Sequence, residues 1–371
     1  MSNQFLDDLK WRGLLAQTTD ETELAKALEK PITAYIGFDP TAPSLHVGNL
    51  VVLLVLRRLQ LAGHKPIALV GGATGLVGDP SGRNDERTLN EESLVSDWVA
   101  RIRDQVSKFL DFDAKSNPAI VVNNLDWTKD LSALELLRGI GKHFSVNQML
   151  SKDSVSSRLE SGGISYTEFS YQVLQALDYL ELFRRHDCTL QLGGSDQWGN
   201  IVQGVELGRR ISNTELFGFT CPLITTSSGA KMGKTAAGAV WLNADMLPVY
   251  DYWQYWRNTE DADVGRFLKL FTELPIDEIR RLEALGGAEI NEAKKILANE
   301  ATAMVHGRGA AEQAAAELHQ ALSRAVDRFN QAARTPAGVP PTLRRRLART
   351  SSQVAAQRDA VARAVKVAAL K

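Results

Sequence analysis

The stretch that decides the fold reads Tyr35-Ile36-Gly37-Phe38-Asp39-Pro40-Thr41-Ala42-Pro43-Ser44-Leu45-His46-Val47-Gly48-Asn49. Its beginning belongs to an apolar run, residues 32–38, which predicts a buried strand. The chain after it is rich in Val and Leu, and residues 49–61 predict a helix. A buried strand followed at once by a helix is typical of a parallel sheet with crossover helices.

The same alternation continues along the chain. Apolar strands are predicted at 66–70, 119–122 and 189–192, and helices at about 90–110 and 198–211. Residues 130–190 are predicted to be helical and inserted, and 248–330 is almost wholly helical. The sequence therefore predicts an α/β fold, with a parallel-sheet domain followed by an all-helical domain. Ligands of such sheets bind beyond the carboxyl ends of the strands, where residues 37–39 and the glycine pair at 71–72 fall.

Composition excludes several classes of protein. The 371 residues are 44% apolar and 23% charged, and no apolar run is long enough to span a bilayer. The N-terminus lacks the pattern of a secretory signal, and the two cysteines, Cys188 and Cys221, have no metal-binding spacing. We therefore expect a cytoplasmic protein without membrane association, whose two thiols are reduced and buried.

Charge is distributed unevenly, although the net charge is only −1. Residues 331–371 carry nine basic side chains and one acidic side chain, and Pro and Gly are frequent at 334–341. The composition of 334–341 predicts a linker. Local contact with RNA and a simple solvated basic terminus explain this tail equally well.

The residues around His46 suit a polyanion such as ATP. His46 and Gly48 open the predicted helix, whose N-terminus offers free N–H groups and positive potential. Gly48 has no Cβ, so a nucleotide can approach the main chain closely. His46 can donate to phosphate, Asn49 can hydrogen-bond ribose, and Thr41 adds a hydroxyl. Taken alone, this pattern favours a histidine that merely caps the helix.

A second motif, Lys231-Met232-Gly233-Lys234-Thr235, lies in a segment rich in Ser, Thr, Gly and Lys that predicts a mobile loop. We call residues 226–246 the lysine loop. When a carboxylate attacks the α-phosphate of ATP, negative charge grows on the departing pyrophosphate. Lysines on a loop can meet that charge in the transition state. This chemistry needs no covalent enzyme intermediate.

Together and in this order, the His46 and Lys231 motifs resemble the two ATP signatures of class I aminoacyl-tRNA synthetases. The stretch from Tyr35 and the sequence Gly193-Gly194-Ser195-Asp196-Gln197-Trp198-Gly199-Asn200 narrow the resemblance to the bacterial tyrosine branch. The resemblance runs to about residue 320. It implies that tyrosine is activated by ATP to tyrosyl-adenylate and then transferred to the 3′-terminal adenosine of tRNA(Tyr). It also implies a homodimer, with Mg²⁺ arriving with ATP and no metal site of the protein's own.

The resemblance divides the chain into four parts. Residues 1–225 would form a Rossmann-like catalytic domain for tyrosine and ATP, and 226–246 the lysine loop and its connection. Residues 247–330 would form a helical, anticodon-proximal domain. Family members continue into a compact RNA-binding domain, for which residues 331–371 are too short. We interpret these residues as a basic linker and tail, in which that domain is missing or reduced to a remnant.

A tyrosine site needs an apolar slot with a polar end for the phenol. Tyr171, Gln175 and Asp178 have the spacing i, i+4 and i+7, which places them on one face of a helix. The resemblance implies that Asp178 and Tyr35 bind the phenol, and that Tyr171, Gln175 and Asp79 hold the α-ammonium group. A buried structural network on that helix face is the alternative. The full tyrosine-binding set that the resemblance implies is Tyr35, Gly37, Asp39, Asp79, Tyr171, Gln175, Asp178, Gln191 and Gln197.

Further residues are assigned to catalysis and to ATP by the same resemblance. The catalytic set is Thr41, His46, Arg83, Arg87, Lys231, Lys234 and Thr235. The ATP-binding set is Gly48, Asn49, Gly194, Asp196 and Lys234. For Arg83 and Arg87 the alternative is a pair of ordinary surface arginines. For Asp196 the alternative, which is compatible with nucleotide binding, is a cap at the start of the helix predicted over 198–211.

Two other functions compete with tyrosine–tRNA ligation. A tryptophan-specific relative would share the architecture, but Tyr35 together with Asp178 argues against it. A synthetase-derived RNA-binding or regulatory protein would not charge tRNA. Such a protein would be expected to lose the lysine motif or His46, and this chain has both.

Overall fold

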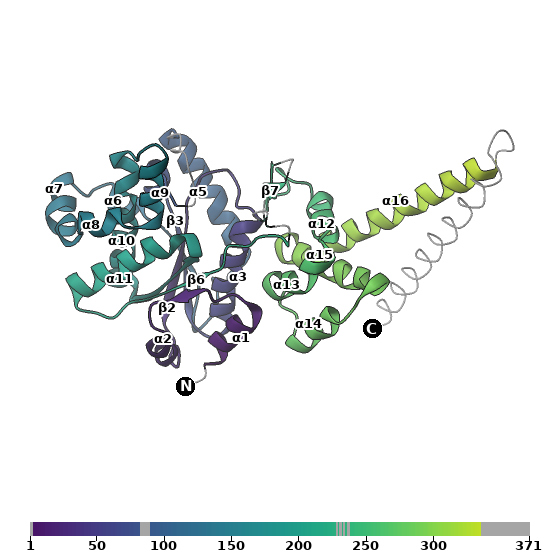
Figure 1. Ribbon diagram of the computed structural model, residues 1–371, viewed down its shortest axis with the longest axis horizontal. Helices are drawn as coiled ribbons and strands as arrows, with labels where there is room; N and C mark the ends of the chain where they lie inside the picture. The colour runs from purple at the N-terminus through teal and green to yellow at the C-terminus, as the bar shows by residue number, and fades with distance from the viewer. Residues whose placement is uncertain are drawn as a thin grey trace.

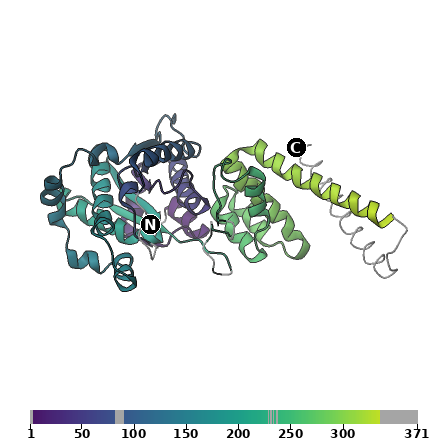
Figure 2. The same ribbon diagram turned by 90° about the horizontal axis from the view of Figure 1, so that it is seen from above.

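The computed structural model describes residues 3–81, 90–227, 229, 232, 234–235 and 238–334. Arg83, Arg87, Lys231 and the tail from residue 335 lie outside the described residues. Figures 1 and 2 show two parts side by side along the long axis. The first contains the main sheet and its helices, and the second is helical.

The main sheet has six strands in the order β1-β6-β5-β2-β3-β4. Their neighbours pair in parallel, except that β1 pairs antiparallel with β6. The strands are β1 (Gln17–Thr18), β2 (Thr33–Phe38), β3 (Lys65–Val70), β4 (Ile120–Asn123), β5 (Cys188–Gly194) and β6 (Phe217–Cys221). The predicted α/β class is confirmed, and four of these strands lie where the sequence predicts them.

Both faces of the sheet are covered, because adjacent residues of a strand point to opposite faces. Ile36 on β2 packs in one apolar cluster with residues of α3, while its neighbour Tyr35 packs in another with Tyr179 of α10. The helices of this first part are α1 (Gln4–Arg12), α2 (Glu21–Ala27), α3 (Val47–Leu61), α4 (Thr74–Val77), α5 (Glu92–Val106), α6 (Leu125–Thr128), α7 (Ala133–Glu135), α8 (Val146–Leu150), α9 (Asp153–Ser161), α10 (Tyr166–His186) and α11 (Trp198–Ser212).

The strand order places a switch point between β2 and β5. From β2 the chain continues outward through β3 and β4, whereas β5 and β6 continue on the other side. A crevice forms at the carboxyl edge of a sheet where the strand order reverses in this way. The ends of β2 and β5, which carry Asp39 and Gly194, therefore meet at one place.

The second part is built from α12 (Val249–Arg257), α13 (Asp261–Phe271), α14 (Ile276–Glu283), α15 (Ile290–His306) and α16 (Arg308–Arg334). Tyr252, Trp253 and Trp256 of α12 are buried in its core. These aromatic rings thus pack the helices of this part against one another. In both views α16 runs away from the body of the molecule (Figures 1 and 2).

Arginines of the sheet-containing part hold the end of α13. The Arg12 guanidinium, which is buried, donates to the carbonyls of Lys269 and Leu274 at 3.1 and 3.2 Å, and Arg58 donates to the carbonyl of Thr272. Carbonyls at a helix C-terminus lack partners within the helix and carry negative potential. The two parts are therefore joined by charge-assisted hydrogen bonds at a defined point.

Candidate functional site

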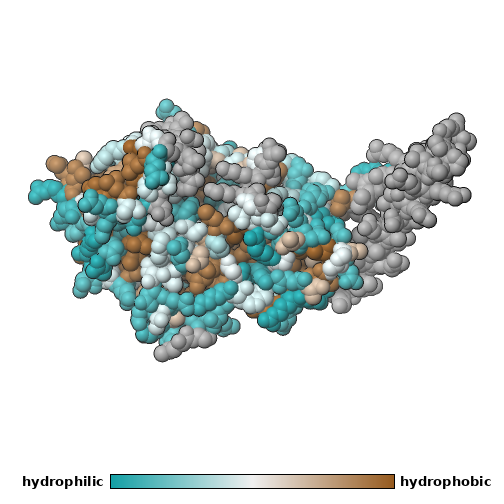
Figure 3. Space-filling view, viewed as in Figure 1, coloured by the Kyte–Doolittle hydropathy of each residue, from teal (hydrophilic) through white to brown (hydrophobic). Residues whose placement is uncertain are grey.

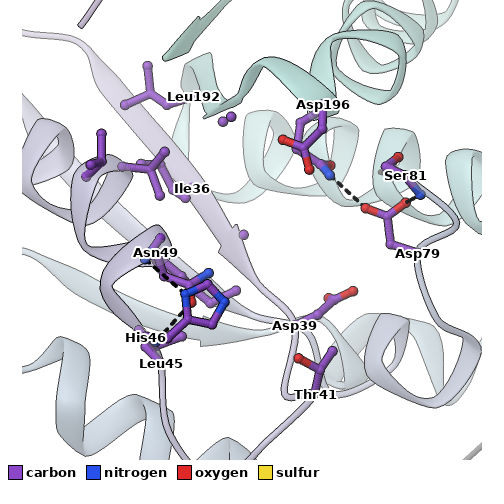
Figure 4. Close-up of a pocket in the computed structure, with 18 of the residues that line it drawn as sticks. Ile36, Asp39, Thr41, Leu45, His46, Asn49, Asp79, Ser81, Leu192 and Asp196 are labelled. Atoms are coloured by element: carbon purple, nitrogen blue, oxygen red, sulfur yellow. Dashed lines mark hydrogen bonds between the residues drawn. The ribbon is translucent and has the colours of Figure 1, made fainter. Parts of the chain in front are cut away.

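A cavity of about 760 Å³ opens at the carboxyl edge of the sheet, where β2 and β5 end. It brings together fifteen of the predicted site residues, drawn from five separate segments of the chain. They are Tyr35, Gly37, Asp39, Thr41, His46, Gly48, Asn49, Asp79, Tyr171, Gln175, Asp178, Gln191, Gly194, Asp196 and Gln197. Figure 4 shows Asp39 and Thr41 on one side of this cavity and Asp79 and Asp196 on the other.

Asp178 lies at the buried end of the cavity and is only 2% exposed. Its carboxylate accepts hydrogen bonds from Asn124 Nδ2 and Trp127 Nε1, each at 2.9 Å. Burial raises the pKa of Asp178 to about 7, although these two hydrogen bonds act in the opposite direction. Near neutral pH this carboxyl is thus close to the balance between its protonated and ionised forms.

Asn124 is oriented by its surroundings. It is fully buried, and its Oδ1 accepts from the main-chain N–H of Ala73 at 2.7 Å. Its Nδ2 is thereby turned toward Asp178 and toward Thr74 Oγ1, the latter at 2.9 Å. Replacing Asn124 would leave several buried polar groups unpaired, which is costly.

Tyr35 presents a buried hydroxyl to the same end of the cavity. Among the residues that the structure describes, its oxygen has no hydrogen-bond partner, and the centroid of its ring lies 5.3 Å from that of Tyr179. Burial, and after it the charge of Asp178, raise the pKa of the Tyr35 hydroxyl well above its usual value. Gln191 Oε1 is likewise buried without a partner. Both residues line the cavity, so these two atoms are available to hydrogen-bond a polar ligand.

A second carboxylate network lies beside the first. The Tyr171 hydroxyl donates to Asp39 Oδ2, and the Thr74 hydroxyl donates to Asp39 Oδ1, each at 2.7 Å. A Cβ on Gly71 would lie 2.1 Å from Asp39 Oδ1 and 2.3 Å from Thr74 Oγ1. Glycine at position 71 therefore allows this network to approach the main chain.

Amide side chains connect Asp79 to the start of α11. Gln197 Nε2 donates to Asp79 Oδ2 at 2.7 Å, and the Ser81 N–H donates to Asp79 Oδ1 at 2.9 Å. Asn200 Nδ2 donates to the side-chain oxygens of Gln197 and Gln175, at 3.2 and 3.1 Å. Carboxylates and amide oxygens that line one wall provide acceptors for a cationic group.

His46 caps α3 with its side chain. The Gly48 N–H donates to His46 Nδ1 at 2.9 Å, and the His46 N–H donates to Asn49 Oδ1 at 3.1 Å, as Figure 4 shows. Because Nδ1 accepts, a neutral imidazole carries its proton on Nε2 and can donate there. A Cβ on Gly48 would lie 2.7 Å from His46 Cε1. Gly48 is therefore needed for the position of the His46 ring, in addition to main-chain access.

The lysine loop returns to the cavity next to His46. The Val47 N–H donates to the carbonyl of Val240, and the Leu242 N–H donates to the carbonyl of Leu45, each at 2.9 Å. Within the loop, β7 (Lys234–Thr235) pairs with β8 (Gly238–Ala239) in an antiparallel arrangement. Only the main chain of Lys234 and Thr235 is described.

Asp196 does not cap the next helix. It lies in a 3₁₀ turn, Ser195–Gln197, and α11 has no side-chain cap hydrogen bond at its start. The alternative role given to Asp196 by its position in the sequence is therefore wrong. Its carboxylate lies beside Gly194 at the edge of the cavity, where a Cβ on Gly194 would approach Asp196 Oδ1 to 2.5 Å.

Sequence reasoning missed four residues that organise this site: Thr74, Asn124, Trp127 and Asn200. Asn124 directly follows β4, and the rule that ligands bind at strand ends could have indicated it. Trp127 gave no signal in the sequence, because its role depends on α6 bringing the indole to Asp178.

Among the described residues, no group of three or more His, Cys, Asp or Glu is arranged to hold a metal ion. No helix of the described chain is long and apolar enough to cross a membrane.

Known proteins resemble the chain over most of its length. The model of the family described as tRNA synthetases class I (W and Y) matches residues 26–323. Tyrosine–tRNA ligases of Agrobacterium fabrum and Nitrobacter winogradskyi are 56% and 58% identical to it, each over 315 residues. Each alignment covers 84% of this chain and 76% of the relative.

The fold of the chain is also similar to the solved structures of aminoacyl-tRNA synthetases. A C-terminally truncated mitochondrial tyrosyl-tRNA synthetase from Aspergillus nidulans has a TM-score of 0.77 at 32% identity, covering 85% of this chain and 93% of its own. A tryptophanyl-tRNA synthetase from Encephalitozoon cuniculi has a TM-score of 0.57 at 12% identity and covers 83% of this chain and 87% of its own. The second resemblance shows the shared fold alone.

Proposed function

The chain belongs to the class I tRNA synthetases of the tryptophan and tyrosine branch and functions as a tyrosine–tRNA ligase, and we propose that the cavity at the ends of β2 and β5 activates tyrosine with ATP. The observation that carries this proposal is that the Tyr35 hydroxyl, which has no hydrogen-bond partner among the described residues, and the carboxyl of Asp178 are both buried and line the same cavity.

The phenol of tyrosine fits these two groups. Asp178 accepts the phenol proton, and the Tyr35 hydroxyl donates to the phenol oxygen. Phenylalanine would leave both groups buried without their partner, and each such group costs about 1–3 kcal/mol. Tryptophan carries a single N–H donor and no oxygen, so it cannot accept from Tyr35. Selectivity for tyrosine thus rests on hydrogen bonding that is already formed around Asp178.

The α-ammonium group fits the opposite wall. The oxygens of Asp79, Gln175 and the Tyr171 hydroxyl line the cavity there, together with Asp39. Such a placement directs the tyrosine carboxylate toward His46 and the start of α3. Gln197 and Gln191 complete the tyrosine site, and Gly37 leaves room for the substrate beside β2.

ATP binds over the start of α3 in this proposal. His46 donates from Nε2 to phosphate, Gly48 and Asn49 contact the nucleoside, and Thr41 adds a hydroxyl. Gly194 and Asp196 lie near the ribose. The tyrosine carboxylate attacks the α-phosphorus, the bond to the bridging oxygen breaks, and pyrophosphate leaves with the electron pair. Lys231, Lys234 and Thr235 stabilise this leaving group, with Arg83 and Arg87 as further contacts.

Mg²⁺ enters with ATP and neutralises phosphate charge, and no step is assigned to a metal site of the protein. A ribose hydroxyl of the terminal adenosine of tRNA(Tyr) then attacks the tyrosyl carbonyl carbon, the bond to the phosphate oxygen breaks, and AMP leaves. The helical part contacts the tRNA near its anticodon arm. Our boundaries place catalysis in residues 1–225, the lysine loop in 226–246 and this helical part in 247–330. We place the enzyme in the cytoplasm.

ATP–pyrophosphate exchange with each amino acid in turn tests the activation step. Tyrosine should support rapid exchange, while phenylalanine and tryptophan should support almost none. Exchange that is equally fast with tryptophan would contradict the tyrosine assignment. Exchange with no amino acid would point instead to a synthetase-derived RNA-binding protein.

We propose that the protein forms a homodimer through an apolar surface between α7 and the start of α10. Six large apolar side chains are exposed between α7 and the start of α10: Leu134, Leu137, Val146, Leu150, Leu159 and Tyr166. Figure 3 shows hydrophobic patches at this end of the molecule. Exposed apolar surface that is concentrated in one region commonly marks a protein interface.

Sedimentation velocity tests this assembly. Leu137→Glu should convert a dimer into monomers, because a charge would be buried at the interface without a partner. Leu61→Glu is the matched control, since Leu61 is also exposed but lies at the end of α3. A protein that is monomeric before any substitution would contradict the homodimer.

A further inference from the structure

The start of the lysine loop is attached to the helical part of the molecule. The Ser227 N–H donates to Asp263 Oδ2 at 2.9 Å, and Ser227 Oγ lies 3.0 Å from the same oxygen. Glu260 Oε2 is the second acceptor near this hydroxyl, at 2.7 Å. Arg266 donates both to Asp263 Oδ1 and to the carbonyl of Thr225. Side chains at the start of α13 therefore hold residues 225–227 from two directions.

Asp263 is buried, so its carboxylate depends on hydrogen bonds from neighbouring groups. The residue is 3% exposed, and a buried carboxylate is unfavourable unless donors surround it. Its donors are the Ser227 N–H and Arg266, one turn along α13, while the single proton of the Ser227 hydroxyl is shared between Asp263 and the closer Glu260. The cap position of α13, Glu260, makes no side-chain cap hydrogen bond. The Asp263 carboxylate thus links the start of the loop to Arg266 on its own helix.

The far end of the loop is held differently. Residues 240 and 242 pair through main-chain hydrogen bonds with Val47 and Leu45, beside His46. Its start depends on side chains of α13, whose other end is fixed by Arg12 and Arg58. The end of the lysine loop is thus bound to the segment that carries His46, and its start is bound to the helical part.

The distance along the chain makes the anchor relevant to chemistry. Lys231 and Lys234 follow Ser227 by four and seven residues. An extended chain advances at most about 3.6 Å per residue, so fixing Ser227 limits the main chain of Lys234, seven residues later, to within about 25 Å. Small errors in the placement of a charged group reduce its effect on a transition state strongly.

We propose that Asp263 is a positioning residue for tyrosine activation, which fixes the start of the lysine loop so that its lysines meet the departing pyrophosphate. Through this contact the helical part of the molecule, which the proposed function assigns to tRNA, influences the chemical step in the first part. The inference rests on the role proposed for the lysine loop.

Substitution of Asp263 tests the proposal in the full-length enzyme. Asp263→Ala should lower kcat for tyrosine-dependent ATP–pyrophosphate exchange about tenfold, while the dissociation constant for tyrosine changes by less than about twofold. Asp263→Asn keeps an oxygen for the Ser227 N–H and should recover most of kcat. Asp261→Ala is the matched control, because Asp261 is in the same turn but faces Lys294 at 2.5 Å.

A double-mutant comparison with Lys234→Ala separates positioning from general stability. If Asp263 acts through the loop, Asp263→Ala should have little further effect in the Lys234→Ala background. Equal losses in both backgrounds, or a parallel loss of tyrosine binding, would overturn the inference. If Lys234→Ala slows activation and Asp263→Ala does not, only this inference fails. If Lys234→Ala leaves kcat unchanged, the proposed role of the loop fails as well.

Discussion

The two ends of the cavity are built in different ways. At the proposed amino-acid end, Asp178 accepts hydrogen bonds from the side chains of Asn124 and Trp127, which come from another segment, and Asn124 is itself oriented by the main-chain N–H of Ala73. At the nucleotide end, His46 is held by main-chain N–H groups at the start of α3, and the lysine loop crosses beside it.

This difference follows from what each end must do. Recognition of a hydroxyl requires groups that are costly to leave unpaired, and such groups must be buried and held in place before the substrate binds. Stabilisation of departing pyrophosphate requires positive charge that acts mainly in the transition state. Substitutions at the two ends should therefore affect different kinetic constants.

The largest effect is expected at the amino-acid end. Asp178→Ala should reduce kcat/KM for tyrosine by about 1,000-fold, or about 4 kcal/mol, because Asn124, Trp127 and the substrate phenol all lose a buried acceptor. The KM for ATP should change by less than about threefold. Steady-state exchange kinetics measure both constants, and normal activation of tyrosine would refute the specificity assignment.

The second largest effect is expected at the nucleotide end. Lys234→Ala should lower the rate of adenylate formation about 100-fold, because its charge is needed as pyrophosphate departs. Tyrosine affinity should remain nearly unchanged. Single-turnover adenylate formation and equilibrium dialysis of tyrosine give the two values. Weak tyrosine binding with a normal maximal rate would show that the two ends are not separable in this way.

A pH series should distinguish the two ends without any substitution. The pKa of Asp178 is raised from 3.8 to about 7, so the carboxyl is mostly protonated at pH 6 and mostly ionised at pH 8. The ionised form is the better acceptor for the phenol, so tyrosine affinity should increase about tenfold from pH 6 to pH 8. Calorimetry of tyrosine binding measures the change, which should be absent in Asp178→Asn. A tyrosine affinity that falls from pH 6 to pH 8 would contradict this prediction.

The smallest effect is expected for Gly48→Ala. The new Cβ would lie 2.7 Å from His46 Cε1, so the ring must move and its cap hydrogen bond is weakened. Loss of a helix cap lowers the stability of the fold by about 1 kcal/mol. Because the ring that donates to phosphate is displaced as well, we expect the KM for ATP to rise about fivefold. The KM for tyrosine serves as the internal control. An equal rise in both constants would indicate a general distortion of the sheet edge.

Much of the fold could be predicted from sequence because its signals are local. Strand β2 and helix α3 lie within a single stretch, and their apolar patterns are clear. Strand β6 was missed, because five buried residues without polar alternation cannot be told from part of a helix. Strand β1 has only two residues and exists through its pairing with β6.

The sequence by itself determined the fold class, the two motifs proposed to bind ATP and fifteen of the residues that line the cavity, because each depends on short-range patterns or on strand ends. Tertiary structure alone decided the chemistry of Asp178, since burial and the hydrogen bonds from Asn124 and Trp127 set its pKa. It also decided the contact between Ser227 and Asp263, which are 36 residues apart. Burial and long-range contacts depend on how all the elements pack, so no local pattern encodes them.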